Sequence, residues 1–162
     1  MNAPVPVIDS REAWAAALHW GFDTACSEGA RCITCVDPSF EHWPLNDAAL
    51  LQTLTTWARL PQRRLVLLAA RFDEVPRRHP RFTAWRRDWA HVVQALQSPP
   101  EFAAELPSVL LDDRLLSAQL LDADHWRGRV ALDRRAHLLL QERVDVVLQR
   151  SEPAFAVTTL GL

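Results

Sequence analysis

The stretch that decides the fold is RLVLLAA, residues 64–70. A continuous apolar run of this length is typical of a strand that is buried on both faces of a parallel sheet. A second such run, RCITCV at residues 31–36, ends in Asp37-Pro38, which is a strand-then-turn signal. Between the two runs, a helix is predicted from Asn46 or Asp47 to about Arg59. Because parallel neighbours need a helical crossover, we expect these two strands to pair in parallel.

Two further helices are predicted beside this core. Residues 10–28 carry apolar side chains at spacings of three and four, and Asp9 with Glu12 fits a capping box in which Asp9 is the N-cap. Residues 81–97 place a stripe of aromatic and aliphatic side chains on one helical face. Both patterns predict amphipathic helices that pack against the sheet.

The C-terminal part of the chain has a different texture. Three short β-type runs, at residues 108–111, 115–121 and 129–132, are separated by turn-forming residues and predict an antiparallel meander. Residues 134–150 predict another long helix, and AFAVTT at 154–159 predicts a final edge strand. The expected fold class is therefore α/β: a mixed β-sheet with a parallel core and an antiparallel meander, and helices on both faces.

Length and charge exclude several classes of function. The 162 residues fit a flexible N-terminal tail at 1–9 followed by a single α/β domain at 10–162. All 18 basic residues are arginine, so mechanisms that need an ammonium group, such as a Schiff base or a P-loop lysine, are excluded. With 20 acidic residues the net charge is −2, which argues against a globally basic nucleic-acid binder. A nucleic-acid partner is therefore not expected.

The sequence also indicates a compartment. The first ten residues lack a basic segment and a long apolar run, so no signal peptide is predicted. No apolar run approaches the roughly 18 residues of a membrane span. The three cysteines are an odd number, and reduced thiols in a cytoplasmic protein are the simplest interpretation. Arginine without lysine is typical of a GC-rich genome, and a bacterial source is expected.

The segment ELPSVLLDDR, residues 105–114, resembles part of the phospholipase D family. That family has this order of elements in each half of its fold, with a His-x-Lys-x4-Asp motif on a late strand. In this chain Asp112 falls at the Asp of the motif, Glu105 at its His and Pro107 at its Lys. The resemblance covers about residues 31–155 in element order, with few matching side chains. It implies one phospholipase D-like half.

The resemblance also implies that catalysis has been lost. The family's His takes up the phosphoryl group and its Lys binds phosphate, and neither Glu105 nor Pro107 can replace them. Active members also bring two motifs together, whereas this chain has one. We therefore expect a non-catalytic phospholipase D-like domain that acts by binding, assembly or regulation. The half-fold and an exposed edge strand suggest a homodimer.

A second hypothesis is an enzyme with a His/Asp pair at the carboxyl ends of the parallel strands. Ligands of open α/β sheets bind beyond these ends. His42 or His125 would act with Asp37 or Asp112 in acid–base catalysis, and Glu105 would lie in the same crevice. The alternative is that Asp37 only forms a turn and that His42 packs over the sheet edge.

A third hypothesis is an anion-binding module built on the arginine cluster between residues 77 and 87. Guanidinium groups suit phosphates and carboxylates because their donors form a fork. The alternative is a solvated helix face with ion pairs, since Asp73, Glu74 and Asp88 dilute the positive charge. The predicted ligand-binding residues for a small anionic ligand are Arg71, Arg77, Arg78, Arg81 and Arg87.

No metal and no cofactor are expected. Cys32 and Cys35 have the spacing of half a zinc site, but the chain has no second pair. Inside a strand, residues three apart point to opposite faces, which favours structural thiols. The six histidines lack metal-ligand spacing, and four glycines cannot form a glycine-rich phosphate loop.

Overall fold

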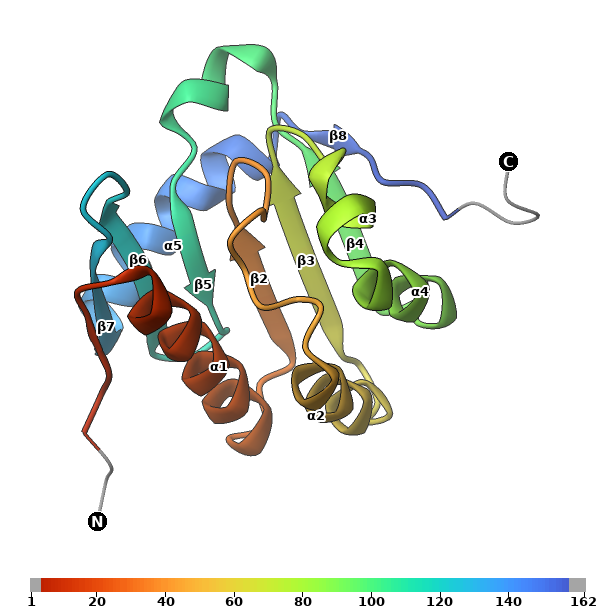
Figure 1. Cartoon of the computed structure of the whole chain (residues 1–162), viewed down its shortest axis with the longest axis horizontal. Coiled ribbons are helices and arrows are strands. Elements are labelled where there is room, and N and C mark those ends of the chain that lie inside the picture. The colour runs from red at the N-terminus through yellow and green to blue at the C-terminus, as the bar shows by residue number, and fades with distance from the viewer. Residues whose placement is uncertain (1–3, 158–162) are drawn as a thin grey trace.

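A computed structural model describes residues 4–157 and shows a β-sheet with helices on both faces (Figure 1). The strands are β1 (Val7–Ile8), β2 (Cys32–Val36), β3 (Arg64–Ala69), β4 (Val93–Gln97), β5 (Ser108–Leu111), β6 (Leu116–Asp122), β7 (Arg127–Leu132) and β8 (Glu152–Pro153). The helices are α1 (Arg11–Ser27), α2 (Ala48–Ala58), α3 (Glu74–Arg78), α4 (Pro80–Asp88), the 3-10 helix η1 (Pro100–Glu105) and α5 (Arg134–Leu148).

The described strands form one eight-stranded sheet in the order β1-β7-β6-β5-β2-β3-β4-β8. Strands β2, β3 and β4 are parallel, and their register places Cys35 beside Leu67 and Leu67 beside Ala95. Strands β5, β6 and β7 form an antiparallel meander that joins β2 through β5. The predicted mixed sheet with a parallel core and an antiparallel meander is therefore confirmed.

The first hydrophobic core lies between the sheet and helices α1, α2 and α4 (Figure 1). Alternate strand residues, such as Ile33, Leu67 and Leu110, point to this side and are fully buried. Trp57 of α2 is 2% exposed, and its indole Nε1 donates to the carbonyl oxygen of Ala30 at 2.6 Å. The ring is thus buried without leaving its N–H unpaired.

The second core lies under α5 on the opposite face of the sheet. Val36, Leu68 and Leu111 point to this side and pack with Leu140 and Val144 of α5. Successive residues of a central strand alternate between the two cores, and both cores exclude water. This alternation is why the run in β3 has to be apolar at every position. Helices on both faces are confirmed.

The predicted helix over residues 81–97 is wrong in its second half. Helix α4 ends at Asp88, and the remaining residues form β4, the third parallel strand. Val93 and Ala95 face the first core, whereas Gln94 between them is exposed. This alternation has the period of a strand, and the apolar residues also fit a helical wheel by chance.

Both ends of the described chain differ from the prediction. Val7–Ile8 is not part of a loose tail, because it pairs antiparallel with β7, and Ile8 is 3% exposed. The last strand is β8, which pairs with the end of β4 and lies before the predicted segment 154–159. Residues 158 and 159 of that segment, and residues 1–3, lie outside the described residues.

The N-cap of α1 is Ser10 and not the predicted Asp9, since the Ser10 hydroxyl accepts from the Ala13 amide at 3.0 Å. We expect Ser10→Ala to lower the free energy of unfolding by about 1 kcal/mol, as measured by urea denaturation. The matched control, Asp9→Ala at an exposed position, is expected to change it by less than about 0.5 kcal/mol. A larger loss from the Asp9 variant would contradict the capping assignment.

Candidate functional site

Asp37 follows β2 at the carboxyl ends of the parallel strands, where a ligand site was predicted. Its carboxylate accepts hydrogen bonds from the amides of Ser39 and Phe40 at 3.0 and 2.7 Å. Its other oxygen accepts from the Ser108 hydroxyl at 2.5 Å. These three bonds hold the loop after β2 against the start of β5. The carboxylate is therefore engaged in the turn, which agrees with the simpler of the two interpretations.

The predicted pairing of His42 or His125 with Asp37 or Asp112 is not found among residues 4–157. The acidic neighbour of His42 is Glu41, at 4.0 Å. The His42 ring packs against the Trp126 ring in a T-shaped arrangement, with centroids 5.2 Å apart. His125 donates to Asp122 at 2.9 Å in an exposed turn, and this hydrogen bond lowers the pKa of Asp122. Each histidine thus serves a local surface contact.

Asp112 follows β5, which runs antiparallel to β2, so it lies at the amino ends of the parallel strands, whereas Asp37 lies at their carboxyl ends. Its carboxylate accepts from the amides of Arg114 and Leu116 at 2.8 and 3.0 Å and closes the turn between β5 and β6. Its carbonyl oxygen accepts from Nε2 of the buried His137 at 2.6 Å. The prediction of one crevice that contains both Asp37 and Asp112 is therefore wrong.

Glu105 and Pro107 do not occupy strand positions of an active motif. Glu105 is exposed and is the last residue of η1, and Pro107 stands before the first residue of β5. Together with the structural role of Asp112, this placement gives no geometric support to a degenerate His-x-Lys-x4-Asp site. The three residues matched the motif by spacing alone.

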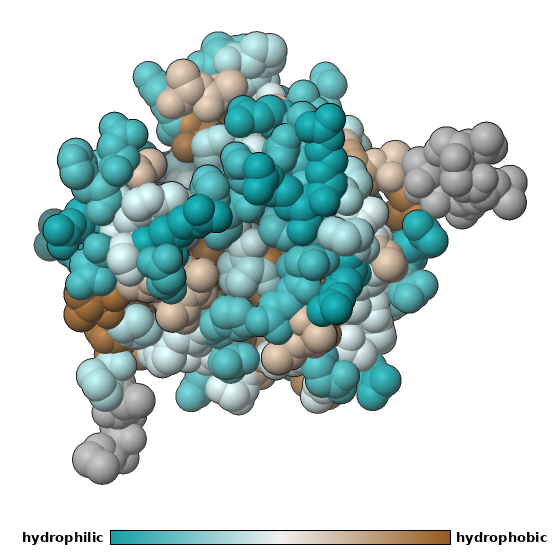
Figure 2. All heavy atoms as spheres, viewed as in Figure 1, coloured by the Kyte–Doolittle hydropathy of each residue, from teal (hydrophilic) through white to brown (hydrophobic). Residues whose placement is uncertain are grey.

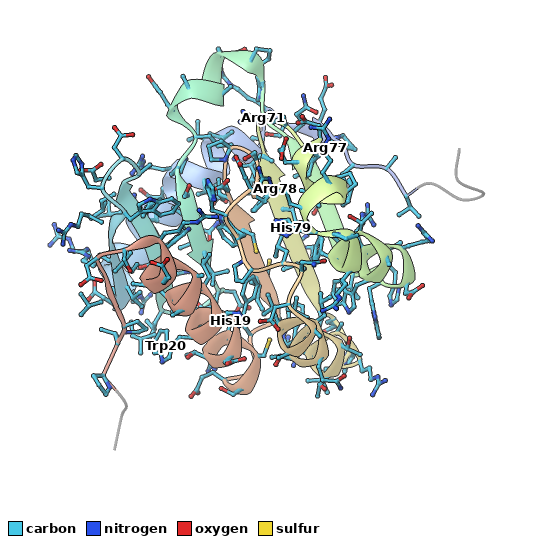
Figure 3. All side chains as sticks on the ribbon, in the orientation of Figure 1. His19, Trp20, Arg71, Arg77, Arg78 and His79 are labelled. Carbon is cyan, nitrogen blue, oxygen red and sulfur yellow. The ribbon has the colours of Figure 1, made fainter. Side chains whose placement is uncertain are left out.

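Arg71, Arg77 and Arg78 lie together near the carboxyl ends of the parallel strands (Figure 3). Arg78 is bound on two sides, to Glu41 at 2.8 Å and to Glu74 at 2.9 Å. The hydrogen bond between Arg78 and Glu74 lowers the pKa of Glu74 and raises that of Arg78. Arg77 is 74% exposed and lies 3.5 Å from Glu74. Arg78 is thus a structural tie, whereas Arg77 is only loosely held.

The other predicted ligand residues, Arg81 and Arg87, are exposed on α4. Within residues 4–157, no acidic side chain lies within 4.0 Å of the guanidinium of Arg71, Arg81 or Arg87. Hydrophilic side chains cover this face over α3 and the loop that follows β2 (Figure 2). Three of the five predicted arginines therefore remain available to an external anion.

Sequence reasoning missed Arg86 as a site residue, and it is the most unusual charged side chain of this segment. It is only 8% exposed, and its Nε and Nη1 atoms are buried without a hydrogen-bond partner in the described part of the chain. It lines a cavity of about 220 Å³ beside Arg87 and Phe155. Burial lowers the pKa of its guanidinium. The available signal was its spacing of four residues from Phe82, which places both on the inner face of α4.

The thiols of Cys26 and Cys35 lie in surroundings that favour the neutral, unreactive form. Burial raises the pKa of Cys26 to about 12 and that of the fully buried Cys35 well above its usual value. Residues 4–157 contain no group of three or more His, Cys, Asp or Glu side chains that could hold a metal ion. Among the same residues, no helix has the length and apolar character needed to cross a membrane.

Comparison with known proteins gives one finding about the fold. No protein-family model and no curated protein match the chain. Among solved structures it is similar to TrmBL2, an archaeal chromatin protein with a novel mode of DNA binding, at a TM-score of 0.63. The sequences are 11% identical, and the likeness covers 95% of this chain and 56% of that one. The chain thus spans about half the length of its structural neighbour, and the likeness shows the fold alone.

This comparison corrects two predictions. The recognition of a phospholipase D-like half is wrong: the fold is similar to that of a chromatin protein, and no comparison supports the phospholipase D family. The prediction against a nucleic-acid partner is also overturned, because the structural neighbour is a DNA-binding protein. Net charge was a poor guide, since it averages over surfaces that can differ locally. The archaeal source of the neighbour gives no support to the expected bacterial source.

Proposed function

We propose that this chain is a non-catalytic binding domain that holds the phosphate groups of duplex DNA through its arginine cluster. The observation that carries the proposal is the set of exposed guanidinium groups without acidic partners in the described residues, namely those of Arg71, Arg81 and Arg87. The DNA-binding function of the structural neighbour supports DNA as the first partner to test.

Local charge supports this choice over the net charge of the chain. Residues 71–88 contain six arginines and three acidic residues, a net charge of +3 in a chain whose total is −2. Arginine forks bind phosphate oxygens through charge-assisted hydrogen bonds, and such contacts supply most of non-specific DNA affinity. A patch of this size is expected to bind weakly and without sequence preference.

The enzyme, homodimer and cytoplasmic hypotheses stay predictions. The enzyme alternative lacks a supporting contact, because His42 and His125 are paired locally within the described residues. The homodimer gains nothing from the sheet edges, since β1 and β8 are each two residues long. A cytoplasmic location is retained as part of the proposal.

The proposal is tested by titrating the protein into a fluorescently labelled duplex at about 50 mM salt and following anisotropy. The variant Arg71→Gln/Arg77→Gln/Arg81→Gln/Arg87→Gln is expected to bind about tenfold more weakly or worse, and to show a shallower dependence of affinity on salt. The control changes four other exposed arginines to Gln, at positions 129, 134, 135 and 143. It removes the same charge, and we expect its affinity to fall less than about threefold.

Three outcomes would contradict the proposal. They are no binding of the duplex at low salt, equal losses from the two quadruple variants, and a larger loss from the control set. Equal losses would mean that overall charge alone governs binding, because both variants have the same net charge. A larger loss from the control set would move the DNA surface to β7 and α5, which carry those arginines.

A further inference from the structure

Arg86 is placed where an arginine without a partner is unfavourable. It is the seventh residue of α4, and its side chain lies on the inner side of the helix with Phe82 and Trp85, which are also buried. Neither Nε nor Nη1 has a hydrogen-bond partner among residues 4–157, and no ion pair to Arg86 occurs there. Buried charges in proteins are nearly always paired, because desolvation of a lone ion is costly.

The contact that Arg86 does make is with an aromatic ring. Its guanidinium carbon lies 5.7 Å from the centroid of the Phe155 ring. The Phe155 ring is stacked on Phe72, with centroids 5.5 Å apart and planes within 3°. A cation over a ring face is attractive, but it satisfies no N–H group. The guanidinium is therefore held in place with Nε and Nη1 unpaired among the described residues.

Arg86 also lines a cavity. It has a volume of about 220 Å³, and its lining combines the two neighbouring arginines with apolar groups. The apolar lining comes from Pro76 and from the segment Phe155–Val157, so residues far apart in the sequence enclose it. The Thr83 hydroxyl also lines it and donates to the carbonyl oxygen of His79 at 3.0 Å, which leaves its oxygen free to accept. Among residues 4–157, no acidic side chain lines the cavity.

We infer that this cavity is a binding site for a small oxyanion, a carboxylate or a phosphate, that carries a compact apolar group. The Arg86 guanidinium binds the oxyanion, Arg87 adds a second positive charge at the cavity, and Phe155 with Pro76 contacts the apolar group. The site differs from the proposed DNA surface, which consists of exposed arginines, and it goes beyond that function. The two share only Arg87.

The test uses the full chain and three probes of similar size: benzoate, phenyl phosphate and benzamide. Isothermal titration calorimetry is expected to show that benzoate, phenyl phosphate or both bind at least about tenfold more tightly than uncharged benzamide. Comparison of the two anions then identifies the preferred head group. Arg86→Gln is expected to weaken anion binding about tenfold or more, because a charge-assisted hydrogen bond is lost.

The matched control is Arg77→Gln, which removes an exposed charge from the same segment and is expected to leave anion binding unchanged. A readout that needs no variant is the Arg86 Nε–H resonance, which should shift and saturate with the anion at the calorimetric affinity. This readout holds even where Arg86→Gln fails to fold.

The inference is overturned where neither anion binds more tightly than benzamide, or by unchanged anion binding in a folded Arg86→Gln variant. It is also overturned where neither anion binds or shifts the Arg86 resonance at up to about 10 mM. Failure of this inference can be told apart from failure of the proposed DNA function. Arg86→Gln removes no exposed arginine, so it should leave duplex affinity unchanged within about threefold. Weaker duplex binding in an Arg71→Gln/Arg77→Gln/Arg81→Gln variant, which keeps Arg87, together with intact benzoate binding would support both sites.

Discussion

Asp112→Ala is expected to lower the free energy of unfolding by about 3 kcal/mol, since two hydrogen bonds to a buried charged acceptor are lost. The carboxylate is 6% exposed and accepts from the amides of Arg114 and Leu116. Without it, the two amides of the turn between β5 and β6 lose their partner, and the Leu116 amide is buried. Urea denaturation, followed by tryptophan fluorescence, measures the loss.

The same variant separates a structural role from a functional one. Because Asp112 lies at the far edge of the sheet from Asp37, the folded variant should bind duplex DNA with the affinity of the parent chain. Asp124→Ala is the control for removal of an exposed carboxylate, and it is expected to change stability by less than about 0.5 kcal/mol. A stable Asp112→Ala variant that had lost duplex binding would refute the structural assignment.

The parallel core could be predicted because its strands leave a one-dimensional signal. RLVLLA in β3 is apolar at nearly every position, and ITCV in β2 is fully buried. Such runs arise only where both faces of a strand are covered, so they reveal the central position of the strand and the need for helices on both faces. The helix caps were less well determined, because Asp9 and Ser10 are both good N-cap residues.

Strand β4 could not be distinguished from a helix by pattern alone. The segment from Trp89 to Val93 contains no glycine or proline to indicate the end of α4. Its apolar residues fit the 3.6-residue period begun by Phe82 and Trp85, and the short alternation of β4 is too brief to outweigh that fit. The pairing of β4 with β3 decides that Val93 is buried and that Gln94 is exposed. Strand β3 lies far from these residues in the sequence, so the local pattern cannot show this pairing.

The candidate sites depend on contacts that sequence distance conceals. Arg86 contacts Phe155, which lies near the end of the described chain, and no local sequence pattern indicates this contact. Conversely, Asp37 and His42 have the residue types of catalytic groups, but local hydrogen bonds and a contact with Trp126 account for them. Residue type indicates what a side chain can do, and tertiary contacts decide whether its groups remain free.

The free energy of unfolding is also expected to depend on His79 as the solution is acidified. His79 is 5% exposed, and its Nε2 donates to the carbonyl oxygen of Phe40 at 2.7 Å, while Nδ1 is buried without a partner in residues 4–157. Burial, together with the nearby positive charge of Arg78, lowers the pKa of His79 below its ordinary value of 6.5. The folded protein therefore holds a neutral imidazole.

The sign of the effect follows from proton binding. Below the unfolded-state pKa of 6.5, the unfolded chain binds a proton at His79 more readily than the folded chain does. The stability that depends on neutral His79 is fully present above this pH, and it is lost as the pH falls toward the lower pKa of the folded state. His79→Phe removes this linkage and the hydrogen bond from Nε2 to the Phe40 carbonyl. That carbonyl still accepts from the Trp43 amide at 3.3 Å, so the cost at neutral pH is about 1 kcal/mol.

The expected result is a stability difference between the parent chain and His79→Phe that is largest near neutral pH and shrinks as the pH falls below 6.5. Urea denaturation at several pH values measures it, and other histidines such as His137 cancel because both chains contain them. His91→Gln, at an exposed residue with no ion pair among the described residues, should follow the parent chain through the whole series. A difference that stays constant or grows on acidification would contradict the neutral, buried state of His79, because a protonated imidazole in the folded protein reverses the sign of the linkage.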